Sequence, residues 1–87
     1  MILITVHDSV AGTWSNPVVA QNEAAAKRDF FTACQDDRSM IGQHPEDFRL
    51  FAIADWLPSL DEGKLPMFHA FESPKFIMQG VRKDVEQ

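Results

Sequence analysis

The chain has 87 residues, of which 45% are hydrophobic, 24% charged and 10% aromatic, and its formal net charge is −5. That length leaves room for one core, so we expect a single α+β domain over residues 1–87. A folded monomer of 9.9 kDa would expose roughly 5,200 Å², against about 14,400 Å² for the unfolded chain. The apolar fraction is too high for a disordered protein, and the apolar runs are too short for a membrane span.

The first residues and the cysteine content indicate where the protein works. The segment Met1–Val6 lacks the basic flank and the cleavage site of a signal peptide. The sequence has one cysteine, which cannot form an internal disulfide and is typical of a reducing compartment. We therefore expect an intracellular protein without membrane association.

The first third of the chain predicts two strands and a helix. Apolar and polar residues alternate from Ile2 to His7, which favours a strand, and a turn at residues 8–13 leads to a second strand from Trp14 to Gln21. Because Pro17 cannot donate a ladder hydrogen bond, this second strand should lie at an edge of the sheet or begin near Val18. Asn22 is a suitable N-cap for a helix that runs to about Gln35. The apolar side of this helix consists of Ala26, Phe30, Ala33 and Cys34.

The remainder predicts two further strands and a second helix. After a long polar connection at residues 36–44, Phe48 to Trp56 reads as a central strand with apolar side chains on both faces, so we expect its middle to be covered on both sides. The sequence Asp61-Glu62-Gly63 signals a hairpin, from which Lys64 to Phe71 pairs back. Ser73 and Pro74 suit the start of a C-terminal helix.

These elements follow the order β-β-α-β-β-α. They predict the α+β class: a small antiparallel sheet of about four strands with one long helix and a C-terminal helix packed on one face. Because such a sheet leaves strand edges exposed, we expect pairing with a second copy, as a homodimer.

The ionisable residues are poorly spaced for catalysis. His7, His44 and His69 have no second His or Cys at the spacing of metal ligands, and Cys34 reads as a core residue. The acidic pairs 36–37 and 61–62 read as solvated loop residues. We expect no enzyme activity, no catalytic residues, no metal site and no cofactor.

Nucleic-acid binding has more support, because exposed aromatic rings can stack on bases while nearby cations hold phosphates. Trp14 lies in or beside the first turn, where a large ring can be exposed, and Trp56 ends the central strand. Packing at the edge of the core is the alternative for both rings. The candidate contact residues are Trp14, Lys27, Arg28, Arg38 and Arg49. The net charge of −5 requires these cations to gather on one local patch.

The order of these signals resembles a known viral family. The stretch His44-Pro45-Glu46-Asp47-Phe48-Arg49-Leu50-Phe51, followed by Asp55-Trp56, is similar to the "H-P-x-D-F-x-L-F" stretch of the small nonstructural protein of gokushovirus-type microviruses. His7-Asp8, Pro17 and Gly63 also fall where the family has its markers, and the resemblance runs from about Ile2 to Val81. His7 replaces the Tyr or Phe frequent before the first Asp, and Leu57-Pro58 replaces a further Asp after Trp56.

The resemblance implies a bacteriophage nonstructural protein of the host bacterial cytoplasm, linked to DNA binding and DNA replication. The expected function is that of a noncatalytic accessory factor in viral genome replication that binds single-stranded DNA. The alternative is a protein–protein interaction module that docks on a phage or host replication or packaging protein through an apolar and acidic surface.

Overall fold

The computed structural model describes residues 1–57 and 63–82. It is an α+β structure with one five-stranded antiparallel sheet and two α-helices. In chain order the elements are β1 (Ile2–Asp8), β2 (Thr13–Trp14), β3 (Val18–Ala20), α1 (Glu23–Cys34), α2 (Met40–Gln43), the 3-10 turn η1 (Pro45–Asp47), β4 (Phe48–Leu57) and β5 (Met67–Gln79).

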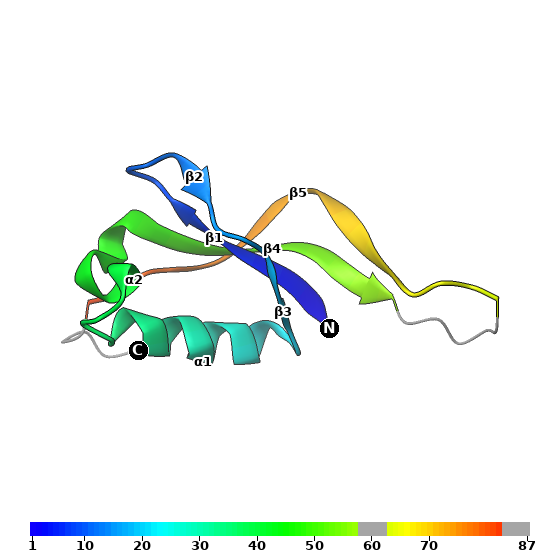
Figure 1. The fold of residues 1–87 in the computed structure, drawn as a ribbon, viewed down its shortest axis with the longest axis horizontal. Coiled ribbons are helices and arrows are strands. Elements are labelled where there is room, and N and C mark those ends of the chain that lie inside the picture. Colours follow the sequence, from blue (N-terminus) through cyan, green and yellow to red (C-terminus); the bar gives the residue numbers. More distant parts are fainter. Residues whose placement is uncertain (58–62, 83–87) are drawn as a thin grey trace.

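The sheet has the strand order β2-β1-β4-β5, and β3 pairs with β1 on the same side as β2. Figure 1 shows that α1 lies along one face of this sheet. The other face, which we call the open face, has no helix over it in the described part of the chain. The sequence predicted the α+β class and the antiparallel sheet, although the sheet has five strands rather than about four. The expectation that the middle of the central strand is covered on both sides was wrong for the described residues, because α1 covers one face only.

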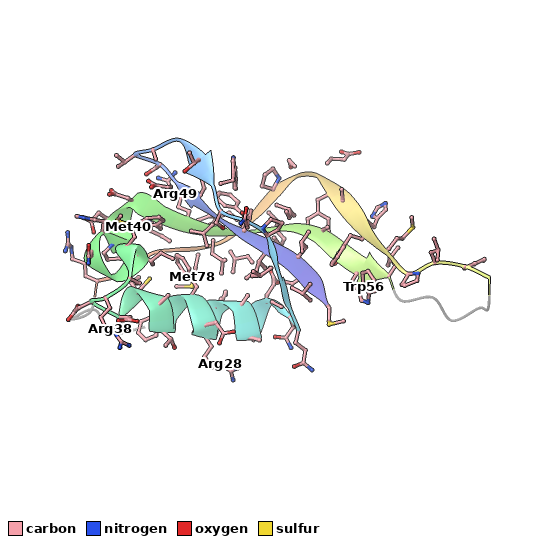
Figure 2. The ribbon with its side chains drawn as sticks, viewed as in Figure 1. Arg28, Arg38, Met40, Arg49, Trp56 and Met78 are labelled. Atoms are coloured by element: carbon pink, nitrogen blue, oxygen red, sulfur yellow. The ribbon has the colours of Figure 1, made fainter. Side chains whose placement is uncertain are left out.

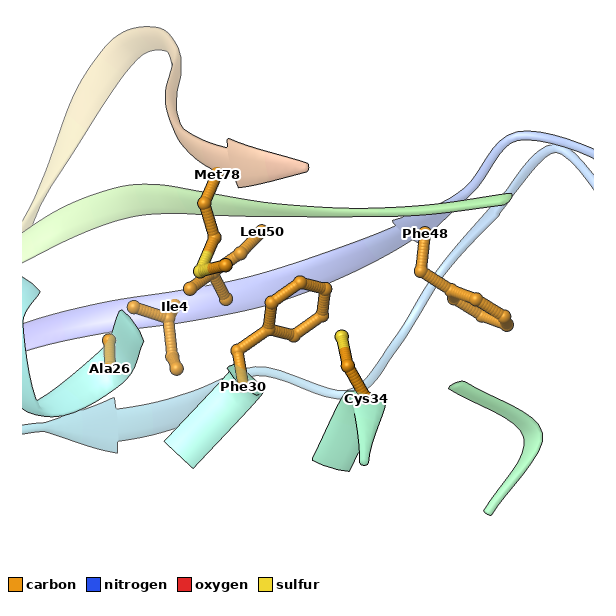
Figure 3. Packing of buried hydrophobic residues seen from close by; sticks show 7 residues of the cluster. All are labelled: Ile4, Ala26, Phe30, Cys34, Phe48, Leu50 and Met78. Carbon is orange, nitrogen blue, oxygen red and sulfur yellow. The ribbon is translucent and has the colours of Figure 1, made fainter. Parts of the chain in front are cut away.

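The alternation predicted for the central strand is confirmed. Phe48, Leu50, Ala52 and Ala54 of β4 are buried, whereas the residues between them are exposed or half-buried. The buried side chains point toward α1, where Ala26, Phe30 and Cys34 complete the core together with Ile4 and Met78 (Figure 3). The core is therefore the single layer between α1 and the sheet.

The long helix begins and ends close to its predicted bounds. The Asn22 side chain caps α1 by accepting a hydrogen bond of 2.8 Å from the backbone N–H of Ala25. Ala26, Phe30 and Cys34 are the buried residues of α1, which confirms three members of the predicted apolar stripe. Cys34 is a core residue, as expected.

Two segments differ from the prediction. The strand expected from Trp14 to Gln21 is divided into β2 and β3, because the chain leaves the edge of β1 around Pro17, which cannot donate a ladder hydrogen bond. The connection expected at residues 36–44 contains α2, whose N-cap Ser39 accepts a hydrogen bond from the N–H of Gly42.

The expected C-terminal helix was wrong where the structure describes it, because β5 continues to Gln79. Ala52 pairs with Lys75 and Ala54 with Ala70, so Ile53 of β4 stands opposite four residues of β5. Ser73 and Pro74 belong to this bulge, where a residue without an N–H costs no ladder bond. The pairing back from residue 64 onward is confirmed from Met67, whereas residues 58–62 and 83–87 lie outside the described residues.

The molecule is elongated, with principal extents of 49 × 24 × 19 Å. Its radius of gyration is 14.5 Å, compared with about 12 Å expected for a compact domain of this length. The elongation comes from the ends of β4 and β5, which project beyond α1 and the N-terminus (Figure 1). We call residues 56–57 and 63–68 the arm.

Candidate nucleic-acid interface

Trp14 is held on the sheet by the turn between β1 and β2. The Asp8 carboxylate accepts hydrogen bonds from the N–H groups of Val10 and Ala11 at 3.0 and 3.2 Å. Gly12 follows with φ +69°, a conformation that favours glycine. This turn reverses the chain within four residues and sets Trp14 directly opposite His7 of β1.

Four rings form a continuous row across the sheet, which we call the aromatic row: His7, Trp14, Phe51 and Phe76. The ring centroids of His7 and Trp14 are 4.5 Å apart, those of Trp14 and Phe51 5.2 Å, and those of Phe51 and Phe76 5.7 Å. The members come from β1, β2, β4 and β5. Their alternation with the core residues places the row on the open face.

Two members of the aromatic row are well exposed to solvent. Trp14 is 48% exposed and Phe76 54% exposed, whereas His7 and Phe51 are half-buried. A group of large exposed apolar side chains is a stronger sign of a binding surface than a single one. The contact of such a group with water is unfavourable, and a bound ligand removes it. The rings are inclined to one another, with interplanar angles of 45°, 64° and 70°, so the exposed rings of Trp14 and Phe76 are separate surfaces for planar ligands.

Arg49 lies beside this row. It stands opposite His7 on β1 and opposite Gln79 on β5, and thus on the open face. Its Nε–H donates a hydrogen bond of 2.9 Å to Oε1 of Gln79, whose amide in turn donates to the carbonyl oxygens of Glu46 and Phe48. The guanidinium is therefore oriented by an uncharged partner. Because a guanidinium has five N–H donors, it can bind an anion in addition to Gln79.

The other three predicted cations are not brought to Trp14. Lys27 and Arg28 are exposed on α1, and Arg38 follows it in the connection to α2. Figure 2 shows Arg28 and Arg38 on the helix side of the molecule and Arg49 on the opposite side. The expectation that these four cations gather on one patch beside Trp14 was therefore wrong: Arg49 alone among them lies on the face of the sheet that carries Trp14, whereas Lys27, Arg28 and Arg38 lie on the helix side.

Carboxylates accompany two of these three cations. Arg28 is 3.8 Å from Asp29, and Nε of Arg38 is 3.1 Å from Oδ1 of Asp36. The hydrogen bonds from the Arg38 side chain and backbone lower the pKa of Asp36 below its ordinary value, and Asp36 raises the pKa of Arg38. These pairs reduce the positive potential of the helix side, so the helix side is a poorer phosphate site than its three cations suggested.

His7, Phe51 and Phe76 were missed as candidate site residues. Because successive side chains of a strand point to opposite faces, the sequence already placed Phe51 on the face of β4 away from the core. The same rule places His7 and Val6 of β1 on opposite faces of the sheet. Phe76 could not be found, because the segment that contains it was assigned to a helix. Trp56, expected to pack at the edge of the core, is half-buried. Its ring contacts that of Phe68 in the arm rather than the aromatic row, with the ring centroids 4.8 Å apart and an interplanar angle of 54°.

Comparison with known proteins gives one match. Within the described residues, no helix is both long and apolar enough to cross a membrane. No curated protein and no solved structure matches the chain. The model of a family described as "Phage ORF5 protein" matches residues 1–82, which is most of the sequence. The chain therefore belongs to the Phage ORF5 protein family, a family of bacteriophage proteins.

Proposed function

We propose that this phage protein is a noncatalytic accessory factor of viral genome replication in the host bacterial cytoplasm, and that it binds single-stranded DNA on the open face of its sheet. The observation that carries the proposal is the aromatic row with Arg49 beside it. The resemblance to the nonstructural protein of gokushovirus-type microviruses, whose genome is single-stranded DNA, supports the choice of ligand.

The row has the size and chemistry needed for unpaired bases. Each base that stacks on an aromatic side chain contributes about 1–3 kcal/mol to single-strand binding, with little dependence on sequence. Four-stranded antiparallel sheets with exposed rings bind two or three unstacked bases in this way in other nucleic-acid-binding folds. Trp14 and Phe76, the exposed rings of the row, would each take a base, and duplex DNA would be disfavoured because its bases are already stacked.

Arg49 would supply the phosphate contact. It stands directly across from His7, next to the rings on which the bases would lie. Its hydrogen bond to Gln79 fixes the direction of the guanidinium before DNA arrives, which reduces the entropy lost on binding. Because Gln79 is uncharged, the positive charge of Arg49 is not neutralised by this partner.

Fluorescence anisotropy with a labelled oligo-dT strand at low salt tests the proposal. We expect single-stranded DNA to bind more tightly than a duplex of equal length, and Trp14→Ala to weaken binding by about five- to 150-fold, the equivalent of 1–3 kcal/mol. Phe68→Ala removes a ring from the arm and is the matched control, which should bind like the wild type. Undetectable binding at low salt, or equal binding by Trp14→Ala, would contradict the proposal.

A second candidate, a protein–protein interaction module, is favoured by the pairing of cations elsewhere on the molecule. Lys75 is bonded to Glu23 at 3.1 Å and Arg82 to Glu46 at 2.7 Å, in addition to the two pairs on the helix side. With a net charge of −5, such a surface suits a basic protein partner better than a polyanion. Retention of a phage or host replication protein at high salt, with no retention of DNA, would support this candidate.

A further inference from the structure

Phe76 reaches the open face through a bulge in β5. Leu50 of β4 pairs with Met78 of β5. The next residue, Phe51, pairs with Phe76, which leaves Ile77 as the extra residue of the bulge. Ile77 and Met78 both pack against the core. The bulge thus turns Phe76 to the opposite face, where its ring contacts that of Phe51.

This bulge exposes a large apolar ring. Without the extra residue, the alternation of a strand would place Phe76 on the same face as Met78, which is the core side. Phe76 is instead 54% exposed, and the contact of its ring with water is unfavourable. Bulges that re-aim a side chain are over-represented next to active sites. The bulge is therefore what completes the ligand-binding surface of the open face.

Trp14 and Phe76 offer their rings at separate places on this face. They come from β2 and β5, the first and last strands in the order β2-β1-β4-β5, and Phe51 lies between them. The centroid of Phe51 is 5.2 Å from that of Trp14 and 5.7 Å from that of Phe76, and its plane is inclined by 64° and 70° to theirs. Neighbouring bases of a stacked strand are parallel and about 3.4 Å apart. A stacked run of bases therefore cannot cover both exposed rings.

A strand that uses both rings has to separate its bases first. Adenine strands stack strongly along themselves because a purine has a large π surface, whereas thymine and cytosine strands stack weakly. The free energy needed to separate the bases is therefore larger for an adenine strand. At sites without base-specific hydrogen bonds, modest sequence preferences come from this stacking strength and from backbone flexibility.

The larger contact area of a purine would offset this cost only on a larger ring. Phe76 offers a single six-membered ring, about the size of a pyrimidine, and the neighbouring ring of Phe51 is inclined to it by 70°. The second ring of a purine would extend beyond Phe76 without a parallel partner. The indole of Trp14 has two fused rings and accepts either class of base. Phe76 is thus the ring that distinguishes between them.

We propose that the open face binds strands of weakly stacked pyrimidines in preference to adenine-rich strands, and that Phe76 determines this preference. The inference rests on the proposed function, because it specifies which single-stranded DNA the aromatic row takes. The preference depends on base size and base stacking rather than on hydrogen bonds, so thymine and cytosine strands should bind alike.

Fluorescence anisotropy with labelled oligo-dT, oligo-dC and oligo-dA of equal length, at low salt and slightly alkaline pH, tests the inference. We expect oligo-dT and oligo-dC to bind with similar affinity, each at least about fivefold more tightly than oligo-dA. Phe76→Ala should weaken the binding of oligo-dT more than that of oligo-dA. Phe76→Trp, which supplies two fused rings, should retain oligo-dT and bind oligo-dA more tightly. Both variants should therefore reduce the ratio of the two affinities.

Phe68→Ala, which removes a ring from the arm, is the matched control and should leave this ratio unchanged. Since Phe76 is 54% exposed, its two variants should remain folded, which circular dichroism checks. Binding of oligo-dA as tight as that of oligo-dT would overturn the inference and leave the proposed function intact. The same holds for a ratio that neither Phe76 variant changes, or for oligo-dC binding as weak as that of oligo-dA. Failure of all three strands to bind would contradict the proposed function, and the inference with it.

Discussion

Among the buried residues, Cys34 carries the only thiol of the sequence and lies between α1 and the sheet. It is 1% exposed, and this burial raises its pKa, because a thiolate would lose its hydration there; a hydrogen bond from the backbone at Val81 acts in the opposite direction. Burial makes a thiol unreactive in two ways: reagents cannot reach the sulfur, and a smaller fraction of the group is present as the reactive thiolate. Cys34 is therefore a packing residue, as its place on the apolar stripe predicted.

We expect the native protein to react with a thiol reagent at least about a hundredfold more slowly than the unfolded protein, because reaction requires opening of the core. The raised pKa also has a consequence for stability. A group whose pKa is higher in the folded state stabilises the fold below its unfolded pKa, and this contribution is lost as the pH rises through the folded pKa.

Urea unfolding at neutral and at strongly alkaline pH measures this loss. The wild type should lose more stability at alkaline pH than Cys34→Ala, which has no thiol to ionise and is the matched control. An equal alkaline loss in the two proteins, or equally fast labelling of the native and unfolded wild type, would contradict the burial of Cys34.

At the scale of elements, the sequence predicted what local rules decide. The N-cap at Asn22 and the apolar stripe identified α1, and strict alternation identified β4. The C-terminal end was mistaken because Ser73 and Pro74 start helices and also occupy strand bulges. The pairing of β5 with β4 decides between the two, and this contact between residues about 25 positions apart leaves no local signal. Phe76, and with it one end of the aromatic row, was lost for the same reason.

Gly80 provides a test of this correction. It follows β5, its N–H donates to the Phe48 carbonyl at 2.8 Å, and a Cβ at this position would collide with the carbonyl of Pro45. We therefore expect Gly80→Ala to destabilise the protein by about 1–3 kcal/mol, the cost of overpacking. In a helix the same substitution would stabilise by about 1 kcal/mol, so the sign distinguishes the two structures.

Thermal and urea unfolding of Gly80→Ala measure that sign. Ser73→Ala, at an exposed position of the bulge, is the control and should change stability by less than about 0.5 kcal/mol. A more stable Gly80→Ala protein would show that the chain does not approach η1 as described.

At the scale of the whole molecule, aromatic, charged and apolar surface residues lie in different regions. Aromatic rings and Arg49 occupy the open face, the ion pairs of Arg28 and Arg38 lie on the helix side, and uncovered apolar side chains lie in the arm. A net charge of −5 opposes the approach of DNA, so binding on the open face must depend on stacking more than on counterion release. The charge pattern thus predicts how the proposed binding responds to salt.

The dependence of single-strand affinity on salt has a slope of about −0.7 for each phosphate that the protein neutralises, in a plot of log K against log salt concentration. With Arg49 as the one cation among the described residues that we place on the open face, we expect a shallow slope of about −0.7, and Arg49→Gln should bring it close to zero. Lys27→Gln, on the helix side, is the matched control and should leave the slope unchanged. A slope steeper than about −3, or one reduced by Lys27→Gln, would mean that the strand also contacts the cations of α1, and the open face alone would no longer account for binding.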